Sequence, residues 1–164
     1  MSEARNLQEL GINLQKIVSR LMANDNLVKL LYYTDKDPLS QPNLTDDQKK
    51  QLIFEKLIKI VPRVGPKETA NSIIALRVKN GQTLSKNQEF MDLTISIEVF
   101  VPLTQWILKS ENLRPFLIMG EVKKSLDNKE INGLGKMYGG DFDLNFLTDE
   151  ISCYEQTFYI TQYD

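Results

Sequence analysis

The sequence predicts an α+β fold, in which a mostly antiparallel sheet with a long β-hairpin packs against an N-terminal amphipathic helix and a second helix near residues 113–128. Three observations predict it. Leucines and isoleucines recur at helical spacing within residues 3–23, and strict alternation runs through residues 90–101. A helix-period segment at 113–128 then precedes a glycine-containing turn and two more alternating segments. Helices and strands segregated in this way are typical of α+β domains.

The N-terminal part is expected to be helical. Spacings of three and four place one apolar stripe along residues 3–23, made of Leu7, Leu10, Leu14, Ile17 and Leu21. We expect this stripe to pack on the domain's own sheet; the alternative is a dimerising coiled-coil seam, which needs heptads over a longer span. A short helical turn is expected near residues 27–33, and two prolines predict a loop over residues 34–43.

A second helical piece is predicted from its N-terminal cap. Thr45 followed by Gln48 matches a capping box, so a short helix is expected to begin there, run through Leu52 and Ile53, and end before Pro62. Residues 57–61 form a short apolar run that fits the end of this helix or a first strand equally well.

Two strands and a long connection form the predicted hairpin. Residues 74–79 alternate and are closed by the turn residues Asn80-Gly81. In the strand at 90–101, apolar residues from Leu93 to Val101 are expected on a buried face, and the polar residues between them, Asp92, Thr94, Ser96 and Glu98, on a solvated one. Residues 80–89 are longer than a tight hairpin needs, so we expect this tip to contact another molecule.

The C-terminal half continues with a helix and two strands. Pro102 stops the long strand, and Trp106, Ile107 and Leu108 form an apolar cluster in connecting chain, which either caps the core or anchors a partner. Pro115 suits a first helical turn. Ile118, Val122 and Leu126 are expected on one face of this helix, and a turn is expected at 132–135. A strand should follow through Phe142, Leu144 and Phe146, with acidic residues on its solvated face. After a bend at 149–150, a last strand is expected with Tyr154, Phe158 and Ile160.

Composition limits the class of protein. The 164 residues are expected to form one domain, with a helical part at 3–55 and a sheet-and-helix part at 56–164. A hydrophobic content of 41% and a net charge of −2 disfavour disorder and a polybasic nucleic-acid surface. Cys153 stands alone, which fits a buried thiol in a reducing compartment. No apolar run approaches membrane length, and the N-terminus lacks a signal peptide's apolar segment, so a soluble, unexported chain is expected.

Signals for chemistry are weak. The chain has no histidine, which removes the usual general base and zinc ligand. Asp141, Asp143, Asn145 and Asp149 resemble the front of an EF-hand loop, but Phe146 and Ser152 stand where its glycine and glutamate belong. Glu121-Val122-Lys123 matches the E-x-K of metal-dependent nucleases, yet it lies in a helix-period segment. We therefore expect no enzymatic activity, no cofactor and no metal.

The order of elements resembles that of the tail-terminator and neck proteins of tailed bacteriophages. The block from Leu113-Arg114-Pro115 through Ile131-Asn132-Gly133-Leu134-Gly135-Lys136, followed by two closing strands, carries this resemblance, which covers most of residues 55–163. The segment 24–55 is longer than in the plainest members. The resemblance implies a structural virion protein, assembled in the host cytoplasm into a ring, usually hexameric. Its implied partners are the tail tube protein and a neck or head-completion protein, with passive contact to passing DNA and none to a membrane.

In that family the hairpin and connecting loops contact neighbours. The interface residues expected here are Gln82, Leu84, Lys86, Phe100, Trp106 and Ile107. Two other hypotheses stay open. One is a metal-dependent nuclease or other DNA-processing enzyme that uses Asp92, Glu121 and Lys123, and the other is a small bacterial adaptor that binds a partner through its N-terminal helix.

Overall fold

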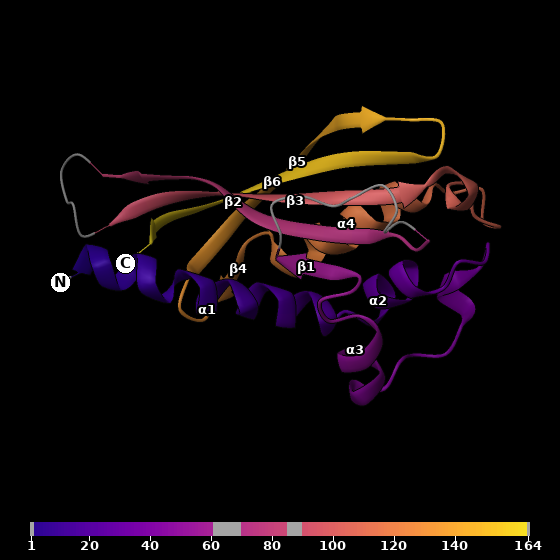
Figure 1. Ribbon diagram of the computed structural model, residues 1–164, viewed down its shortest axis with the longest axis horizontal. Helices are drawn as coiled ribbons and strands as arrows, with labels where there is room; N and C mark the ends of the chain where they lie inside the picture. Colours follow the sequence, from indigo (N-terminus) through magenta and orange to yellow (C-terminus); the bar gives the residue numbers. More distant parts are fainter. Residues whose placement is uncertain (1, 61–69, 85–89, 164) are drawn as a thin grey trace.

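A six-stranded sheet carries all its helices on one face in the computed structural model, which describes residues 2–60, 70–84 and 90–163 (Figure 1). The strand order is β1-β2-β3-β6-β5-β4. The strands are β1 (Ile58–Ile60), β2 (Ile73–Thr83), β3 (Met91–Pro102), β4 (Lys129–Ile131), β5 (Gly135–Leu147) and β6 (Ile151–Tyr163). Strand β1 pairs parallel with β2, and the other pairings are antiparallel. The predicted α+β fold is confirmed.

The helices lie close to their expected positions. They are α1 (Ser2–Met22), α2 (Asp25–Tyr32), α3 (Asp46–Leu52) and α4 (Arg114–Leu126), with 3₁₀ turns η1 at Pro38–Ser40 and η3 at Leu103–Gln105. The capping box is present, because Gln48 N donates to Thr45 Oγ1 over 3.2 Å and Thr45 N donates to Gln48 Oε1 over 2.8 Å. Pro115 stands in the first turn of α4, as expected.

One apolar core fills the space between the helices and the sheet. Ile17 and Leu21 of α1 and Ile118 and Val122 of α4 are fully buried there. Helix α1 contacts α2, α4 and β1, so its stripe packs within the molecule as expected. Leu7 is an exception, because it is 63% exposed near the start of the helix.

The expectation that one face of β3 is solvated is wrong for Ser96 and Glu98, which are both buried. Strand β3 is central, between β2 and β6, so long side chains from both neighbours can cover it. Arg77 of β2 forms an ion pair with Glu98, and Asn145 of β5 also reaches the same carboxylate. A charge can stay buried there because it is paired.

The first hairpin is longer than predicted. Asn80 and Gly81 do not form its turn; they lie within β2, which continues to Thr83 past a β-bulge between Val78 and Asn80. Strand pairing continues because β3 supplies partners down to Met91, and Leu84 N still donates to Phe90 O. The rest of the tip, residues 85–89, lies outside the described residues. Within the ambiguous segment 57–61, residues 58–60 form strand β1, and residue 61 lies outside the described residues. Strand β4 was not anticipated.

Candidate interaction surface

The hairpin of β5 and β6 extends beyond the helix that supports it (Figure 1). Strands β5 and β6 have 13 residues each, and α4, which packs on this part of the sheet, also has 13. At about 3.3 Å per strand residue and 1.5 Å per helix residue, the strands are about 43 Å long and the helix about 20 Å. The helix therefore covers only part of the hairpin, and residues 141–150 are all exposed.

Large apolar side chains are exposed at this end of the molecule. They are Phe142 and Leu144 at 52%, Phe146 at 41%, Leu147 at 59% and, on α4, Phe116 at 40%. Sequence analysis expected Phe142, Leu144 and Phe146 on a buried face, which is wrong. Phe116 in the first turn of α4 touches Phe142, but α4 runs from there away from the hairpin tip, and Phe146 lies against Phe100 on the other face of the sheet. Of these exposed residues, Phe116, Phe142 and Leu144 lie on the face that α4 packs on, and exposed apolar side chains that gather on one face mark interaction sites.

Four aromatic rings and one leucine form what we call the aromatic surface: Trp106, Phe116, Phe142, Tyr154 and Leu144. The rings of Phe116, Phe142 and Tyr154 lie 5.6–6.0 Å from one another, and Trp106 lies 6.3 Å from Tyr154. Leu144 is the cross-strand partner of Tyr154. The rings support one another at edge-on or tilted angles, so the surface is held in shape before any partner binds.

A shallow pocket of about 560 Å³ adjoins the aromatic surface between α4 and β5. Phe116 and Phe142 form one wall, the space beside Gly120 is open, and the Lys123 side chain lies over Gly140. Gln156, at 1% exposure, also lines it. Its Nε2 donates to the carbonyls of Met119 and Gly140, but its Oε1 accepts from no described residue. The pocket thus combines an apolar wall with one unsatisfied acceptor.

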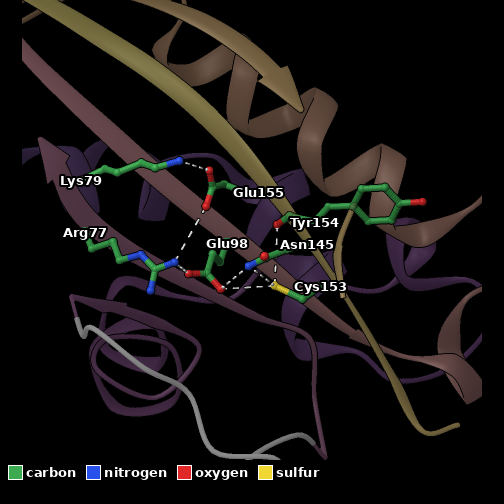
Figure 2. A network of polar contacts seen from close by, with 7 residues as sticks. All are labelled: Arg77, Lys79, Glu98, Asn145, Cys153, Tyr154 and Glu155. Carbon is green, nitrogen blue, oxygen red and sulfur yellow. Dashed lines mark hydrogen bonds and ion pairs between the residues drawn. The ribbon is translucent and has the colours of Figure 1, made fainter. Parts of the chain in front are cut away.

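The opposite face of the sheet carries a polar network that holds the hairpin in place (Figure 2). Arg77 pairs with Glu98, and Lys79 Nζ lies 2.9 Å from Glu155 Oε1. Asn145 Nδ2 donates to Glu98 Oε2 over 3.4 Å, as Figure 2 shows. The network connects β2, β3, β6 and β5, and so fixes the exposed end of β5 to the centre of the sheet.

Two groups in this network have shifted pKa values. The hydrogen bond from Lys79 lowers the pKa of Glu155, and nearby positive charge adds to the effect. Burial raises the pKa of Cys153 to about 12. The thiol is therefore neutral near pH 7 and donates to Glu98 Oε2 over 3.3 Å. The expectation of a buried cysteine is confirmed.

The interface residues expected from the sequence do not form one surface. Gln82 is exposed, Leu84 is half-buried, and Lys86 lies outside the described residues. Phe100 is 4% exposed, whereas Ile107 is 63% exposed. Gln82 pairs with Asp92 and Phe100 with Ile73, so the two groups sit at opposite ends of β3, about 26 Å apart along the strand.

Of those residues, only Trp106 belongs to the aromatic surface. Sequence analysis missed Phe116, Phe142, Leu144, Phe146 and Leu147 as exposed residues. One signal could have pointed to them: a strand as long as the helix in residue count is about twice as long in space, so that helix alone cannot cover it.

The motifs weighed for catalysis lie in regular structure. Glu121 and Lys123 belong to α4, as expected, and Glu121 Oε2 accepts from Asn24 Nδ2 over 2.9 Å. Asp141, Asp143 and Asn145 lie in strand β5, not in an ion-binding loop. Within the described ranges, no group of three or more acidic, histidine or cysteine side chains is placed to hold a metal ion. No helix in these ranges is long and apolar enough to span a membrane.

Comparison with known proteins defines the class of this chain. The YomW family model matches residues 24–159, which is most of the chain, so the protein belongs to the YomW family, a phage-derived family. The expected phage relationship is confirmed, while the tail-terminator or neck assignment stays a prediction. No curated protein matches significantly.

A solved structure titled "Virion of native gene transfer agent (GTA) particle" contains a similar chain, with 10% sequence identity, a TM-score of 0.44, and coverage of 65% of this chain and 78% of that one. At this TM-score the likeness says nothing about what the present chain binds.

Proposed function

We propose that this protein is a structural component of a phage virion that assembles into a ring, as a tail terminator or as a neck component that joins the tail to the head. The observation that carries the proposal is the aromatic surface on an overhanging hairpin. A chain that worked alone would leave this apolar area in water, whereas neighbouring copies or tail proteins would cover it.

The role requires complementary surfaces and no catalysis. One ring face would bind the tail tube protein and the other a neck or head-completion protein, and the ring would be hexameric as in the phage proteins that the sequence resembles. Membership of a phage-derived family supports a virion location, with assembly in the host cytoplasm.

The test compares two apolar surfaces of similar exposure. The double variant Phe142→Ser/Leu144→Ser removes the centre of the aromatic surface, and Ile12→Ser changes a residue on α1 that is even more exposed, at 68%. For both variants and the wild type, the mass in solution and the thermal melting temperature are measured, and electron microscopy shows whether rings are present.

We expect rings from the wild type and from Ile12→Ser, and folded monomers from the double variant, because interface aromatics carry most of an interface's binding energy. A wild type that stays monomeric at every soluble concentration would contradict the ring. Loss of assembly in Ile12→Ser alone would instead favour the N-terminal helix as the binding surface, which is the adaptor hypothesis.

A further inference from the structure

Two segments of the sheet have an open edge among the described residues. Strand β4 pairs with β5 only at residues 135–137, and Asp127 Oδ1 accepts from Gly139 N just beyond it. From residue 141 to residue 147, β5 pairs with β6 alone. Strand β1 likewise pairs with β2 only at residues 74–76, so residues 78–83 pair with β3 alone. Open edges present backbone donors and acceptors to another strand.

The open edges have opposite charge on the same face of the sheet. Cross-strand partners share a face, and the pairs Arg77–Ser96–Thr157–Asp141 place Arg77 and Asp141 on the face of the polar network. Asp143 lies on that face opposite Glu155, so the β5 edge is acidic. Lys79, which is 56% exposed and pairs with Glu155, is the basic side chain of the β2 edge.

Strand direction allows the two edges to meet. Strands β2, β3, β6 and β5 are antiparallel in turn, so β5 runs opposite to β2. The open segments lie at different ends of the sheet, because residues 141–144 share rows with residues 74–77. A second copy in the same orientation, shifted along the strands by about four residues or about 13 Å, would present residues 78–81 of its β2 edge antiparallel to residues 141–144 of β5, with the helices of both copies on one side. The core-facing Phe142 and Leu144 would then lie next to Val78 of the second copy and lose their exposure.

The same charges disfavour the two symmetric alternatives. Pairing β5 with β5 would bring Asp141 and Asp143 of two copies together, and pairing β2 with β2 would bring Lys79 against Lys79. Like charges set against each other across an interface suppress pairing. Bulges interrupt both edges, which further restricts them to a partner of matching shape.

We propose that the β5 edge pairs with the β2 edge of a second copy of this chain, so that the sheet continues from copy to copy around the ring. The proposal rests on the proposed function and supplies its contact. An interface that joins two different edges is heterologous, and heterologous contacts close into rings when the rotation between copies fits.

A charge exchange tests the pairing. Asp143→Lys should weaken self-association by about tenfold or more, and so should Lys79→Glu, because each sets like charges against each other across the interface. A mixture of the two variants should assemble again, since each contact in an alternating ring then joins one positive and one negative residue. Asp149→Lys, in the bend beyond the edge, is the matched control and should assemble like the wild type. Melting temperatures show that each variant is folded.

Each outcome separates this pairing from the proposed function. Rings that form in either single variant as well as in the wild type would overturn the edge pairing and leave the ring standing. Weakening by Asp143→Lys alone, with no rescue on mixing, would indicate a β5–β5 contact and would also overturn it. A wild type that never assembles would overturn the ring itself.

Discussion

At the scale of single residues, Arg114 does more for this fold than its position in a surface helix suggests. It is fully buried, and its guanidinium donates to the carbonyls of Gln105, Leu30, Tyr33 and Asp35 over 2.5–3.0 Å. Burial lowers its pKa, while Asp35 acts in the opposite sense. One planar cation thus connects the first turn of α4 with the end of α2, the loop after it and η3.

Replacing Arg114 should destabilise the protein strongly. We expect Arg114→Lys and Arg114→Ala each to lower the free energy of unfolding by about 3–5 kcal/mol, because four carbonyls, two of them in buried hydrogen bonds, lose their donor and an ammonium cannot reproduce the guanidinium fork. Urea denaturation measures this loss. Lys124→Ala, an exposed cation on the same helix, is the control and should change little. An Arg114→Lys variant as stable as the wild type would show that the fork geometry is unimportant.

Trp106 is expected to contribute to stability as well as to the aromatic surface. Its Nε1 donates to Ser152 Oγ over 2.9 Å, and its ring packs partly against the core. Trp106→Ala should lower the free energy of unfolding by about 3 kcal/mol. The neighbouring Ile107→Ala changes a side chain that is 63% exposed and should leave melting unchanged. Equal melting of both variants would mean that Trp106 serves binding alone.

At the scale of elements, the polar network decides where the exposed hairpin lies. Asn145 sits at a register shift of β5 between Leu144 and Phe146, and its amide reaches Glu98 and Cys153. The shift turns Phe146 toward Phe100, with ring centroids 5.9 Å apart, while Leu144 stays opposite Tyr154 on the other face. One bulge therefore divides the apolar residues of β5 between two faces.

The network makes stability depend on pH in a predictable direction. The pKa of Glu155 is lowered in the folded state, so its ionisation stabilises the fold above its unfolded value of about 4.3 and this contribution is lost as pH falls through the folded value. The free energy of unfolding of the wild type should therefore fall more steeply below about pH 5 than that of Glu155→Gln. Glu150→Gln, in the exposed bend, should follow the wild type. Parallel curves for Glu155→Gln and the wild type would contradict the role of this carboxylate.

At the scale of the whole molecule, the helical part at 3–55 and the sheet part share one core. Residues from α1, α2 and α4 and from the strands belong to the same buried cluster, which includes Ile17, Leu30, Ile97 and Phe158. We propose on this basis that residues 1–164 form one domain. The sheet's two open edges lie on opposite sides of it, which suits a unit that repeats around a ring.

One domain implies one cooperative unfolding transition. Urea curves followed by the fluorescence of Trp106, the chain's single tryptophan, and by far-ultraviolet circular dichroism of the helices should coincide. An earlier loss of helical signal would show that the N-terminal helices unfold by themselves and would contradict the single domain.

Local chemistry was enough to predict most of the elements, although β4 was not anticipated. Helical spacing in α1, the Thr45 capping box, Pro115 in the first turn of α4 and alternation in β3 each depend on neighbours within a few residues, and all are confirmed. The E-x-K triplet was correctly placed on a helix for the same reason.

What covers each strand was decided only in three dimensions. Alternation shows that a strand has two different faces, but burial depends on what packs over them. Glu98 is buried because Arg77 and Asn145, distant in sequence, reach over it. Phe142 and Leu144 are exposed because 13 residues of helix are about half as long as 13 residues of strand. The interaction surface arises from this difference in length, which takes effect only when the helix and the strand are packed against each other.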